Sequence, residues 1–322
     1  MKSGDAATAA LPAPVPLTRR YPWLGGLSRF GGGMVFLWPS LVLFGGFVFY
    51  PLIKSVYLGF FVSDPFGHGQ EFVGFDQYRE VLTSPDFRKS LGVTVLFALY
   101  TVPTGMVLGL VFALLANQRL RGALFFRTVF SSTIAASVAV AAVMWLMLLN
   151  PSAGFVNWIL GQFDMPRVNW LTDPQWRETW DSGPALMAVS LTTIWLNIGF
   201  TTLVILAALQ NIPQDLYESA RVDGASPWSL LRHITLPMLS PALLFVVVVS
   251  TIIAFQSFGQ IHILTRGGPL DATNVIVYSI YTDAFINFEY GAAAVRAVAL
   301  FLLVLALTLV QFRFLARRVF YR

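Results

Sequence analysis

Few side chains in this sequence have the chemistry of a catalytic or metal site. The 322 residues include no cysteine, which excludes disulfides and thiolate metal ligands. The three histidines, His68, His233 and His262, are far apart in the sequence and suggest no ligand cluster. A G-x-x-x-x-G-K-[ST] loop, which cradles nucleotide phosphates, does not occur. We therefore expect no catalytic residue, no metal, no cofactor and no ATP hydrolysis by this chain.

The composition is that of a membrane protein. Hydrophobic residues make up 56% of the chain and charged residues only 11%. Soluble proteins contain about 25% charged residues. The formal net charge of +5 does not indicate nucleic acid as a partner, because membrane proteins owe a positive balance to their cytoplasmic anchors. The expected surroundings are a phospholipid membrane.

One long polar segment, at about 212–237, lies between apolar runs and has the signals of two short helices. Pro213 can open the first helix, and Gly224 is placed to stop it in a left-handed conformation. Ser226 offers an N-cap oxygen and Pro227 a first turn for the second helix. Pro237 is expected to end that helix before the next apolar run. The segment predicts a helix, a tight turn and a helix at a membrane surface.

This segment resembles the EAA loop of ABC-importer permeases, E-A-A-x-x-D-G-A followed after five residues by F-x-x-I-x-L-P. Eight positions match: Glu218, Ala220, Asp223, Gly224, Ala225, Ile234, Leu236 and Pro237. Ser219 replaces the second alanine and Leu231 the aromatic residue. The alternative is an ordinary amphipathic hairpin resting on lipid headgroups.

The resemblance implies that the hairpin contacts a separate ATPase subunit and transmits its movement to the membrane helices. Glu218 is then the ionic anchor to a basic residue, although an isolated Glu on a helix is more often simply solvated. Asp223 and Gly224 form the turn, while Trp228 and Leu231 are candidates to fill an apolar groove.

We expect an all-α polytopic membrane protein with six transmembrane helices and a cytoplasmic helix-turn-helix loop. A transmembrane helix needs about 20 apolar residues. Residues 1–30 are expected to form a flexible cytoplasmic tail, and residues 31–322 the permease domain. The expected spans are about 34–53, 91–115, 129–149, 185–209, 239–261 and 292–312.

The distribution of Lys and Arg predicts that both termini and the EAA-like loop are cytoplasmic. With that orientation, thirteen Lys and Arg residues are cytoplasmic, seven are outside and Arg296 lies within a span. The seven outer residues are Lys54, Arg79, Arg88, Lys89, Arg167, Arg177 and Arg266.

Polar side chains inside expected spans are candidates for a substrate pathway, because such residues usually face a cavity or a partner. They are Asn197, Gln256, Ser257, Gln260 and Arg296. For the amide side chains the alternative is hydrogen bonding between helices. Arg296 is close to a span end, so it either snorkels to the interface or faces an anionic substrate.

Three further motifs resemble carbohydrate-type ABC-importer permeases. Phe72–Tyr78 is similar to F-V-G-L-D-N-F/Y, Asn150–Asn157 to L-N-P-x-x-G-x-x-N, and Leu264–Thr273 to L-T-x-G-G-P-x-x-A-T. The resemblance implies a heterodimer with a second permease, two ATP-binding cassette ATPase subunits and an extracytoplasmic substrate-binding protein. It also implies location in a bacterial cytoplasmic membrane.

Within that family, the sequence is most similar to the branch that imports sn-glycerol 3-phosphate and glycerophosphodiesters such as glycerophosphocholine. The residues behind this similarity are Asp64–Gly67, Ala208–Gln210, Ile212-Pro213 and Val310–Arg313 with Val319 and Tyr321. A permease for a neutral sugar such as trehalose or maltose is the alternative. An ion-coupled secondary transporter is disfavoured, because the expected spans contain no Asp or Glu. A membrane enzyme would need a cluster of reactive side chains, and the sequence suggests none.

Overall fold

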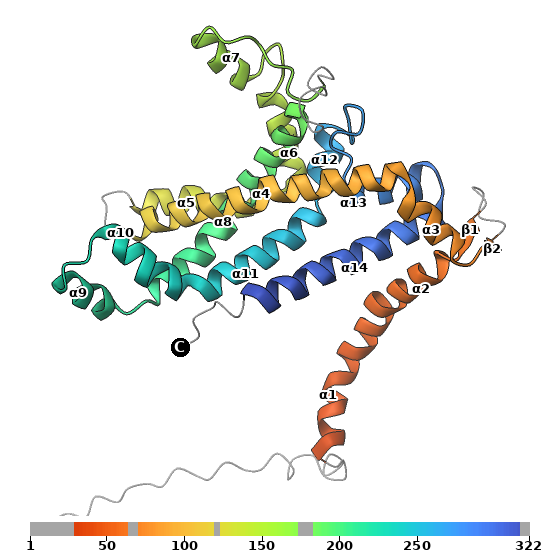
Figure 1. Ribbon diagram of the computed structural model, residues 1–322, viewed down its shortest axis with the longest axis horizontal. Helices are drawn as coiled ribbons and strands as arrows, with labels where there is room; N and C mark the ends of the chain where they lie inside the picture. The colour runs from red at the N-terminus through yellow and green to blue at the C-terminus, as the bar shows by residue number, and fades with distance from the viewer. Residues whose placement is uncertain (1–28, 64–69, 119–122, 173–182, 316–322) are drawn as a thin grey trace, which may run out of the picture. The chain divides into compact units, whose positions relative to one another are not determined.

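A computed structural model describes residues 29–63, 70–118, 123–172 and 183–315 of the chain. These residues are mostly helical and include a single two-stranded sheet (Figure 1). The expected cytoplasmic tail, residues 1–30, lies almost entirely outside the described residues. Two compact units are present, Met1–Lys54 and Ser55–Arg322.

One apolar helical segment begins in the first unit and ends just inside the second. Helix α1 (Arg29–Phe44) leads through a π-helical turn, η3 (Gly45–Phe49), into α2 (Tyr50–Leu58). The turn is closed by a bond from the Tyr50 amide to the Gly45 carbonyl, just before Pro51. Because proline removes a donor and its ring crowds the preceding turn, a wider turn at this point lets the helix continue. The large apolar side chains of this segment, among them Phe36, Trp38 and Phe47, are exposed.

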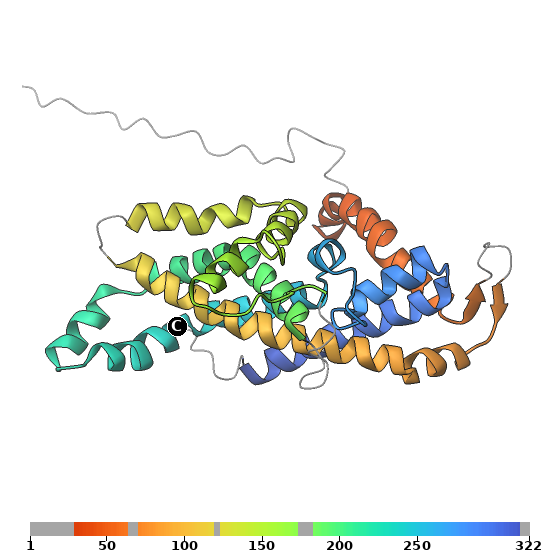
Figure 2. The ribbon, with the colours of Figure 1, turned by 90° about the horizontal axis from the view of Figure 1, so that it is seen from above.

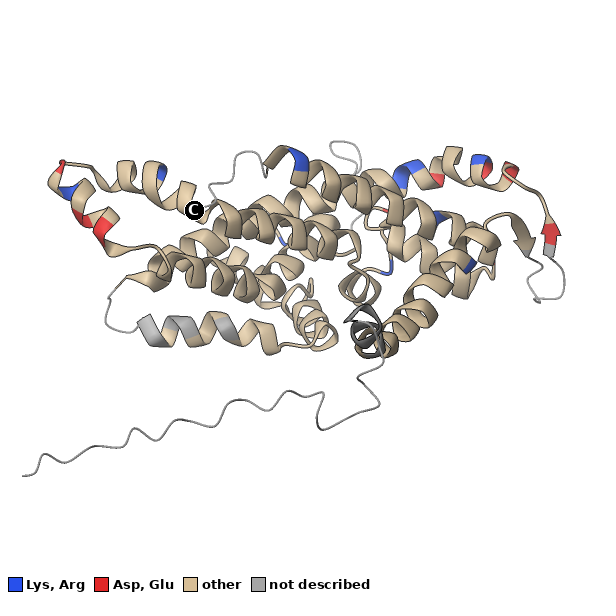
Figure 3. Ribbon diagram, turned by 90° about the horizontal axis from the view of Figure 1, so that it is seen from below, with Lys and Arg blue, Asp and Glu red and all other residues tan. Residues whose placement is uncertain are grey.

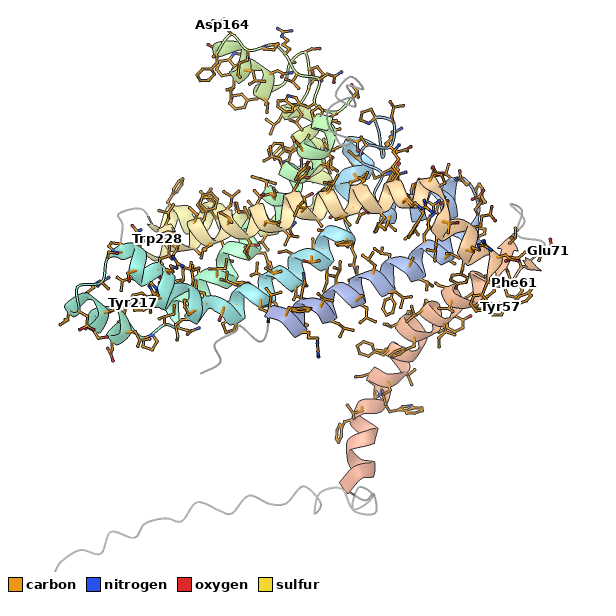
Figure 4. All side chains as sticks on the ribbon, in the orientation of Figure 1. Tyr57, Phe61, Glu71, Asp164, Tyr217 and Trp228 are labelled. Carbon is orange, nitrogen blue, oxygen red and sulfur yellow. The ribbon has the colours of Figure 1, made fainter. Side chains whose placement is uncertain are left out.

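The second unit begins with an aromatic hairpin. Strands β1 (Phe61–Ser63) and β2 (Gln70–Phe72) pair antiparallel with Phe61 opposite Phe72, and helix α3 (Asp76–Thr83) follows. The rings of Phe61 and Phe72 are 5.4 Å apart, and Figure 4 labels Phe61 and Glu71 on the two strands. The Tyr78 hydroxyl donates to the Val56 carbonyl at 3.0 Å, and burial raises the pKa of that hydroxyl.

Within the described residues, five helical stretches are long and apolar enough to cross a membrane. The number rises to as many as six if a bent pair of helices counts as one span. This count agrees with the predicted fold class of an all-α membrane protein with six transmembrane helices. Four of them are α4 (Pro85–Asn117), α8 (Gly183–Gln210), α14 (Tyr290–Leu315) and the stretch Pro227–Phe255, and the fifth is Phe36–Leu58. In the bent pair, α5 (Ala123–Ser132) and η4 (Thr133–Ala135) meet α6 (Val138–Leu148) at 111°.

Helices α4 and α8 form the main packed pair of the second unit. They approach closely where Gly109 meets Thr201, and a Cβ at position 109 would collide with the Thr201 side chain. One buried apolar cluster includes Phe97, Leu186 and Ile261, and another includes Ile205 and Leu239. Charged residues gather on α9 (Gln214–Val222) and the turn after it, and from β2 to the start of α4, away from the middle of the long helices (Figure 3).

The fifth span differs from its prediction at both ends. Helix α10 (Pro227–Leu230), the π-helical turn η6 (Leu231–Thr235) and α11 (Leu236–Phe255) form one stretch from Pro227 to Phe255. Pro237 therefore does not end the helix, because the π-helical turn before it, closed from the Leu236 amide to the Leu231 carbonyl, accommodates its ring. The expected continuation to residue 261 is also wrong, since α11 ends at Phe255.

The remaining helices are short. They are α7 (Phe155–Gln162), α9 (Gln214–Val222), α12 (Gly259–Leu264), α13 (Ile276–Tyr281) and the π-helical turn η7 (Thr282–Ile286). In both Figure 1 and Figure 2, α9 and α10 project together at one end of the second unit.

Candidate functional site

The predicted helix-turn-helix is present as the α9–α10 hairpin, residues 213–235. Gly224 has φ +81°, the left-handed conformation that its position predicted. The Gly224 amide donates to the Arg221 carbonyl at 3.0 Å, and the Ala225 amide donates to the Ala220 carbonyl at 2.9 Å. These two bonds form a Schellman motif, which satisfies carbonyls at the end of α9. Nothing lies within 4 Å of a Cβ built on Gly224, so the demand for glycine comes from the backbone.

The second helix of the hairpin also begins as predicted. The Ser226 hydroxyl oxygen accepts from the Ser229 amide at 3.3 Å, and Pro227 occupies the first turn. The hairpin is fixed to the spans by its inner face. Leu216 and Tyr217 pack against the buried cluster around Ile205 and Leu239, and the Tyr217 hydroxyl is 3.1 Å from the Thr235 hydroxyl.

The opposite face of the hairpin presents both charged and apolar side chains to the surroundings. Glu218, Asp223 and Trp228 are exposed, whereas Ala220, Ala225 and Leu231 are partly buried. Trp228, labelled with Tyr217 in Figure 4, is 69% exposed, and Val222 is 87% exposed. The sequence did not single out Val222, although an apolar residue just before the Asp-Gly turn is a signal for it.

Four of the five predicted pathway residues line one cavity of about 540 Å³, here called the uncharged cavity. Asn197 comes from α8, and Gln256, Ser257 and Gln260 come from the break between α11 and α12. The rest of the lining is Thr133, Ile134, Ala136, Val138, Leu196, Phe200, Ile253, Phe258 and Gly259. Two interrupted helices therefore meet at this cavity, and no charged residue from the described part of the chain lines it.

Hydrogen bonds fix some polar groups of the uncharged cavity and leave others available. The Gln260 amide donates to the Thr193 hydroxyl at 3.0 Å, and the Asn197 amide donates to the Thr193 carbonyl at 2.9 Å. The Ser257 hydroxyl donates to the Ile253 carbonyl at 2.9 Å. Gln256 is exposed, and its side chain has no hydrogen-bond partner among the described residues. Amide and hydroxyl groups in this arrangement can bind hydroxyl groups of a solute.

The break in the fifth span lies where the chain packs closely. Gly259 opens α12 against α6, and a Cβ there would lie 2.9 Å from Cγ1 of Val138. Helix α12 packs against α6, and the Gln256 amide still donates to the carbonyls of Ile252 and Ile253. Interrupted backbone inside a membrane protein is tolerated where it lines a cavity. The break therefore places the polar row from Gln256 to Gln260 at a cavity wall.

Arg296 lies elsewhere, in an ion pair that neither interpretation of the sequence considered. Its Nε is 2.9 Å from Oδ2 of Asp283, and the two side chains are only 12% and 8% exposed. Asp283 lies in η7, outside the spans, and burial raises the pKa of its carboxyl, although Arg296 acts in the opposite direction. The sequence signal that was missed is an acidic residue inside the apolar run Ile276–Ile286.

Arg296 and Asp283 line a second cavity, of about 190 Å³, here called the polar pocket. A second ion pair faces it, with Lys89 Nζ 3.2 Å from Oδ2 of Asp271 and donating to the Leu270 carbonyl at 2.6 Å. The other lining residues are Asp86, Ser90, Asn274, Ser279, Thr282 and Asn287. Among the residues that the structure describes, the polar pocket and the uncharged cavity have no lining residue in common.

Comparison with known proteins identifies relatives of the chain. The family model "binding-protein-dependent transport system inner membrane component" matches residues 102–321. The sn-glycerol-3-phosphate transport system permease protein UgpA of Agrobacterium fabrum is 36% identical over 88% of this chain and 94% of the relative. The protein of the same name from Pectobacterium atrosepticum is 34% identical over 89% of this chain and 95% of its own length.

Solved structures share the fold. A chain of a bacterial alginate ABC transporter, in complex with an alginate pentasaccharide-bound periplasmic protein, matches with a TM-score of 0.74. The match covers 92% of this chain and 94% of that chain at 24% identity. Another structure, of a bacterial ABC transporter involved in the import of alginate, matches with a TM-score of 0.75.

Proposed function

Since the chain belongs to the family of inner membrane components of binding-protein-dependent transport systems, we propose that it is a pore-forming permease subunit of an ABC importer, coupled to a separate ATPase. The observation that carries this proposal is the α9–α10 hairpin, a rigid turn whose exposed face combines Glu218 with Val222 and Trp228. Exposed apolar side chains beside charged ones are typical of a protein interface. Glu218 supplies an ionic contact, and Val222, Trp228 and Leu231 fill an apolar groove.

Closure of the ATPase subunits pushes the hairpin, and the spans change between two arrangements. The hairpin transmits this movement because its inner face is packed on the spans through Leu216 and Tyr217. Ala220, Asp223, Gly224 and Ala225 preserve the shape of the turn. Two ATPase subunits serve a heterodimer of this chain and a second permease.

The cargo proposed is sn-glycerol 3-phosphate or a glycerophosphodiester such as glycerophosphocholine. The names of the relatives and their 34–36% identity support this substrate class. Asn197, Gln256, Ser257 and Gln260 bind the glycerol hydroxyls in the uncharged cavity. Because the described lining offers no cation, the phosphate charge is met by the partner permease. Arg296 is not needed as a direct ligand, since Asp283 already compensates its charge.

A neutral sugar such as trehalose is a second candidate cargo, favoured by one specific observation. The described lining of the uncharged cavity provides amides, hydroxyls and two aromatic rings, Phe200 and Phe258, but no cationic side chain. Such a lining suits a polyol without a phosphate group.

The proposed orientation places the α9–α10 hairpin and both termini in the cytoplasm. The polar pocket and the β1–β2 hairpin then face outward, where an extracytoplasmic substrate-binding protein delivers cargo. The distribution of Lys and Arg supports this orientation.

Uptake into proteoliposomes tests the function and the cargo together. The vesicles contain this chain with its neighbouring permease, ATPase and binding protein, and they receive labelled sn-glycerol 3-phosphate, glycerophosphocholine and trehalose. We expect the vesicles to take up the phosphate esters only when ATP is present. Uptake of trehalose alone would replace the substrate class but keep the importer, while uptake without ATP would contradict the coupling.

A further inference from the structure

The segment after α6 holds a short helix rigidly by one buried side chain. The Asn157 amide nitrogen donates to the Pro151 carbonyl at 3.1 Å and to the Val168 carbonyl at 2.9 Å. Its oxygen accepts from the Val168 amide at 3.2 Å and from the Trp170 ring nitrogen at 3.1 Å. Two donors and two acceptor positions are the full capacity of an asparagine side chain. Asn157 therefore ties α7 to the chain on both sides of it.

Backbone geometry before α7 adds to this rigidity. The Asn150 side-chain oxygen accepts from the amides of Ser152 and Ala153 at 2.9 and 3.0 Å. Gly154, which precedes the helix, is buried, and a Cβ there would collide with the carbonyl oxygens of Leu148 and Asn150. The entry into α7 is thus fixed by a turn that only glycine fits.

The face of α7 opposite Asn157 is apolar and exposed. Phe155, Trp158 and Ile159 lie within a stripe about 100° wide on a helix with 3.6 residues per turn. The rings of Phe155 and Trp158 are stacked, with centroids 5.7 Å apart. Trp158 is 60% exposed, and Phe163, just beyond the helix, is 74% exposed. Figure 4 marks the following residue, Asp164, near the tip of this segment.

We propose that the apolar face of α7 lies in the headgroup boundary of the phospholipid bilayer and anchors the outer end of the bent span. The first reason is the exposed apolar side of α6, which precedes α7 in the chain. Val140, Met144 and Met147 are exposed at a spacing of four and three residues, which puts them on one side of α6. Met147 lies only eight residues before Phe155, so the two exposed apolar faces are close to each other in the chain.

The second reason is the composition of the segment. Residues 155–163 contain no charged side chain but include Phe155, Trp158 and Phe163. Trp is enriched at membrane interfaces, where its apolar ring and its polar N–H are both accommodated, and Phe is common on the apolar face of helices that lie in the interface. A binding protein that docks and leaves would return these rings to water in each cycle, whereas the bilayer covers them throughout. The lipid surface is therefore favoured over a protein partner.

Single cysteine variants test the proposal, because the native chain contains no cysteine. Trp158→Cys and Phe163→Cys are labelled with bimane in the assembled importer, whose partner subunits are made free of cysteine. Arg167→Cys, an exposed polar position in the same segment, is the matched control. Each complex is used only after it elutes as the assembled species. The vesicles contain either ordinary lipids or lipids brominated near the headgroups.

At both apolar positions, brominated lipids are expected to lower the bimane emission about twofold, and aqueous iodide should quench it little. At Arg167→Cys, iodide should quench the emission strongly and brominated lipids should quench it little. The result should not depend on anionic lipid or on salt, because the face carries no charge. Strong iodide quenching at positions 158 and 163 would overturn the proposal. Protection of those positions only when binding protein is added would also overturn it and would assign the face to that partner. Because Phe163 lies outside α7, its result remains informative if Trp158→Cys fails to assemble.

Discussion

The α9–α10 hairpin and the polar pocket both concentrate charged residues, but they use them in opposite ways. In the hairpin, Glu218, Arg221 and Asp223 are exposed, and none of them forms a salt bridge within the described residues. In the polar pocket, Lys89 and Arg296 are each paired with an aspartate. Charges without an internal partner are available to another protein, whereas paired charges hold segments of the same chain together. The same residue types therefore predict different consequences of mutation.

The largest expected effect is from reversing the hairpin charge. Glu218→Arg should abolish ATP-dependent uptake while leaving the complex assembled in the membrane, because in the proposed contact it would place a like charge against a basic residue of the ATPase. Uptake and ATPase activity in proteoliposomes measure this effect. Glu80→Arg, an equally drastic change at an exposed position of α3, is the control and should retain uptake. Normal uptake by Glu218→Arg would contradict the proposal that the exposed charges of the hairpin bind another protein.

The second expected effect is on stability. Arg296→Met leaves the carboxylate of Asp283 buried without its partner, and breaking a buried pair in this way costs about 3–5 kcal/mol. Adding Asp283→Leu should restore most of the loss, since an apolar pair can replace a buried ion pair. Thermal unfolding of the purified complex measures both variants. If assembled Arg296→Met complex instead shows an altered KM for a phosphorylated cargo, Arg296 contacts the cargo and the pocket is more than structural.

A third prediction compares two similar hydrogen bonds. Gln260 donates to Thr193 at the uncharged cavity, and Gln311 donates to Thr251 between α14 and α11 at 2.9 Å. Gln260→Leu should lower uptake about tenfold, the equivalent of one lost hydrogen bond to cargo. Gln311→Leu should cost similar stability and leave the uptake per assembled complex unchanged. Equal effects of both variants on uptake would make Gln260 a packing residue only.

The smallest expected effect is a pH dependence of stability. Because burial raises the pKa of the Asp283 carboxyl, its contribution to stability is complete below the ordinary carboxyl pKa and is lost as the pH rises through the raised pKa. The wild-type complex should therefore lose a little stability as the pH rises above the ordinary carboxyl range. Asp283→Asn, which does not titrate, should lack this slope. A pH series of unfolding temperatures checks the difference, and parallel curves would contradict it.

Local chemistry was sufficient to predict the hairpin. Gly224, Ser226 and Pro227 each act through the backbone of their immediate neighbours, so their roles can be recognised from spacing alone. The spans were likewise evident from the lengths of the apolar runs. Pro237 is the exception, because a π-helical turn before it accommodates a residue that ordinarily ends a helix.

The tertiary features could not be predicted in the same way. The break after Phe255 brings Gly259 against Val138, and these two residues are 121 positions apart in the numbering. The polar residues Asn197, Gln256, Ser257 and Gln260 were recognised singly, but their convergence on one cavity followed from that break. Arg296 was recognised without Asp283, because the partner lies outside the expected span in an irregular turn.

The uninterrupted helical stretch from Pro227 to Phe255 connects the α9–α10 hairpin at one end with the uncharged cavity at the other. At 1.5 Å per residue it is about 43 Å long. Its first turn carries Trp228, and its last residue is followed by Gln256, which lines the uncharged cavity. A rigid tilt of about 10° around one end would displace the other by roughly 7 Å, which exceeds the length of a helical turn. The π-helical turn that keeps Pro237 inside this helical stretch thus determines whether a push at the hairpin arrives as a displacement at the uncharged cavity or is taken up as a bend.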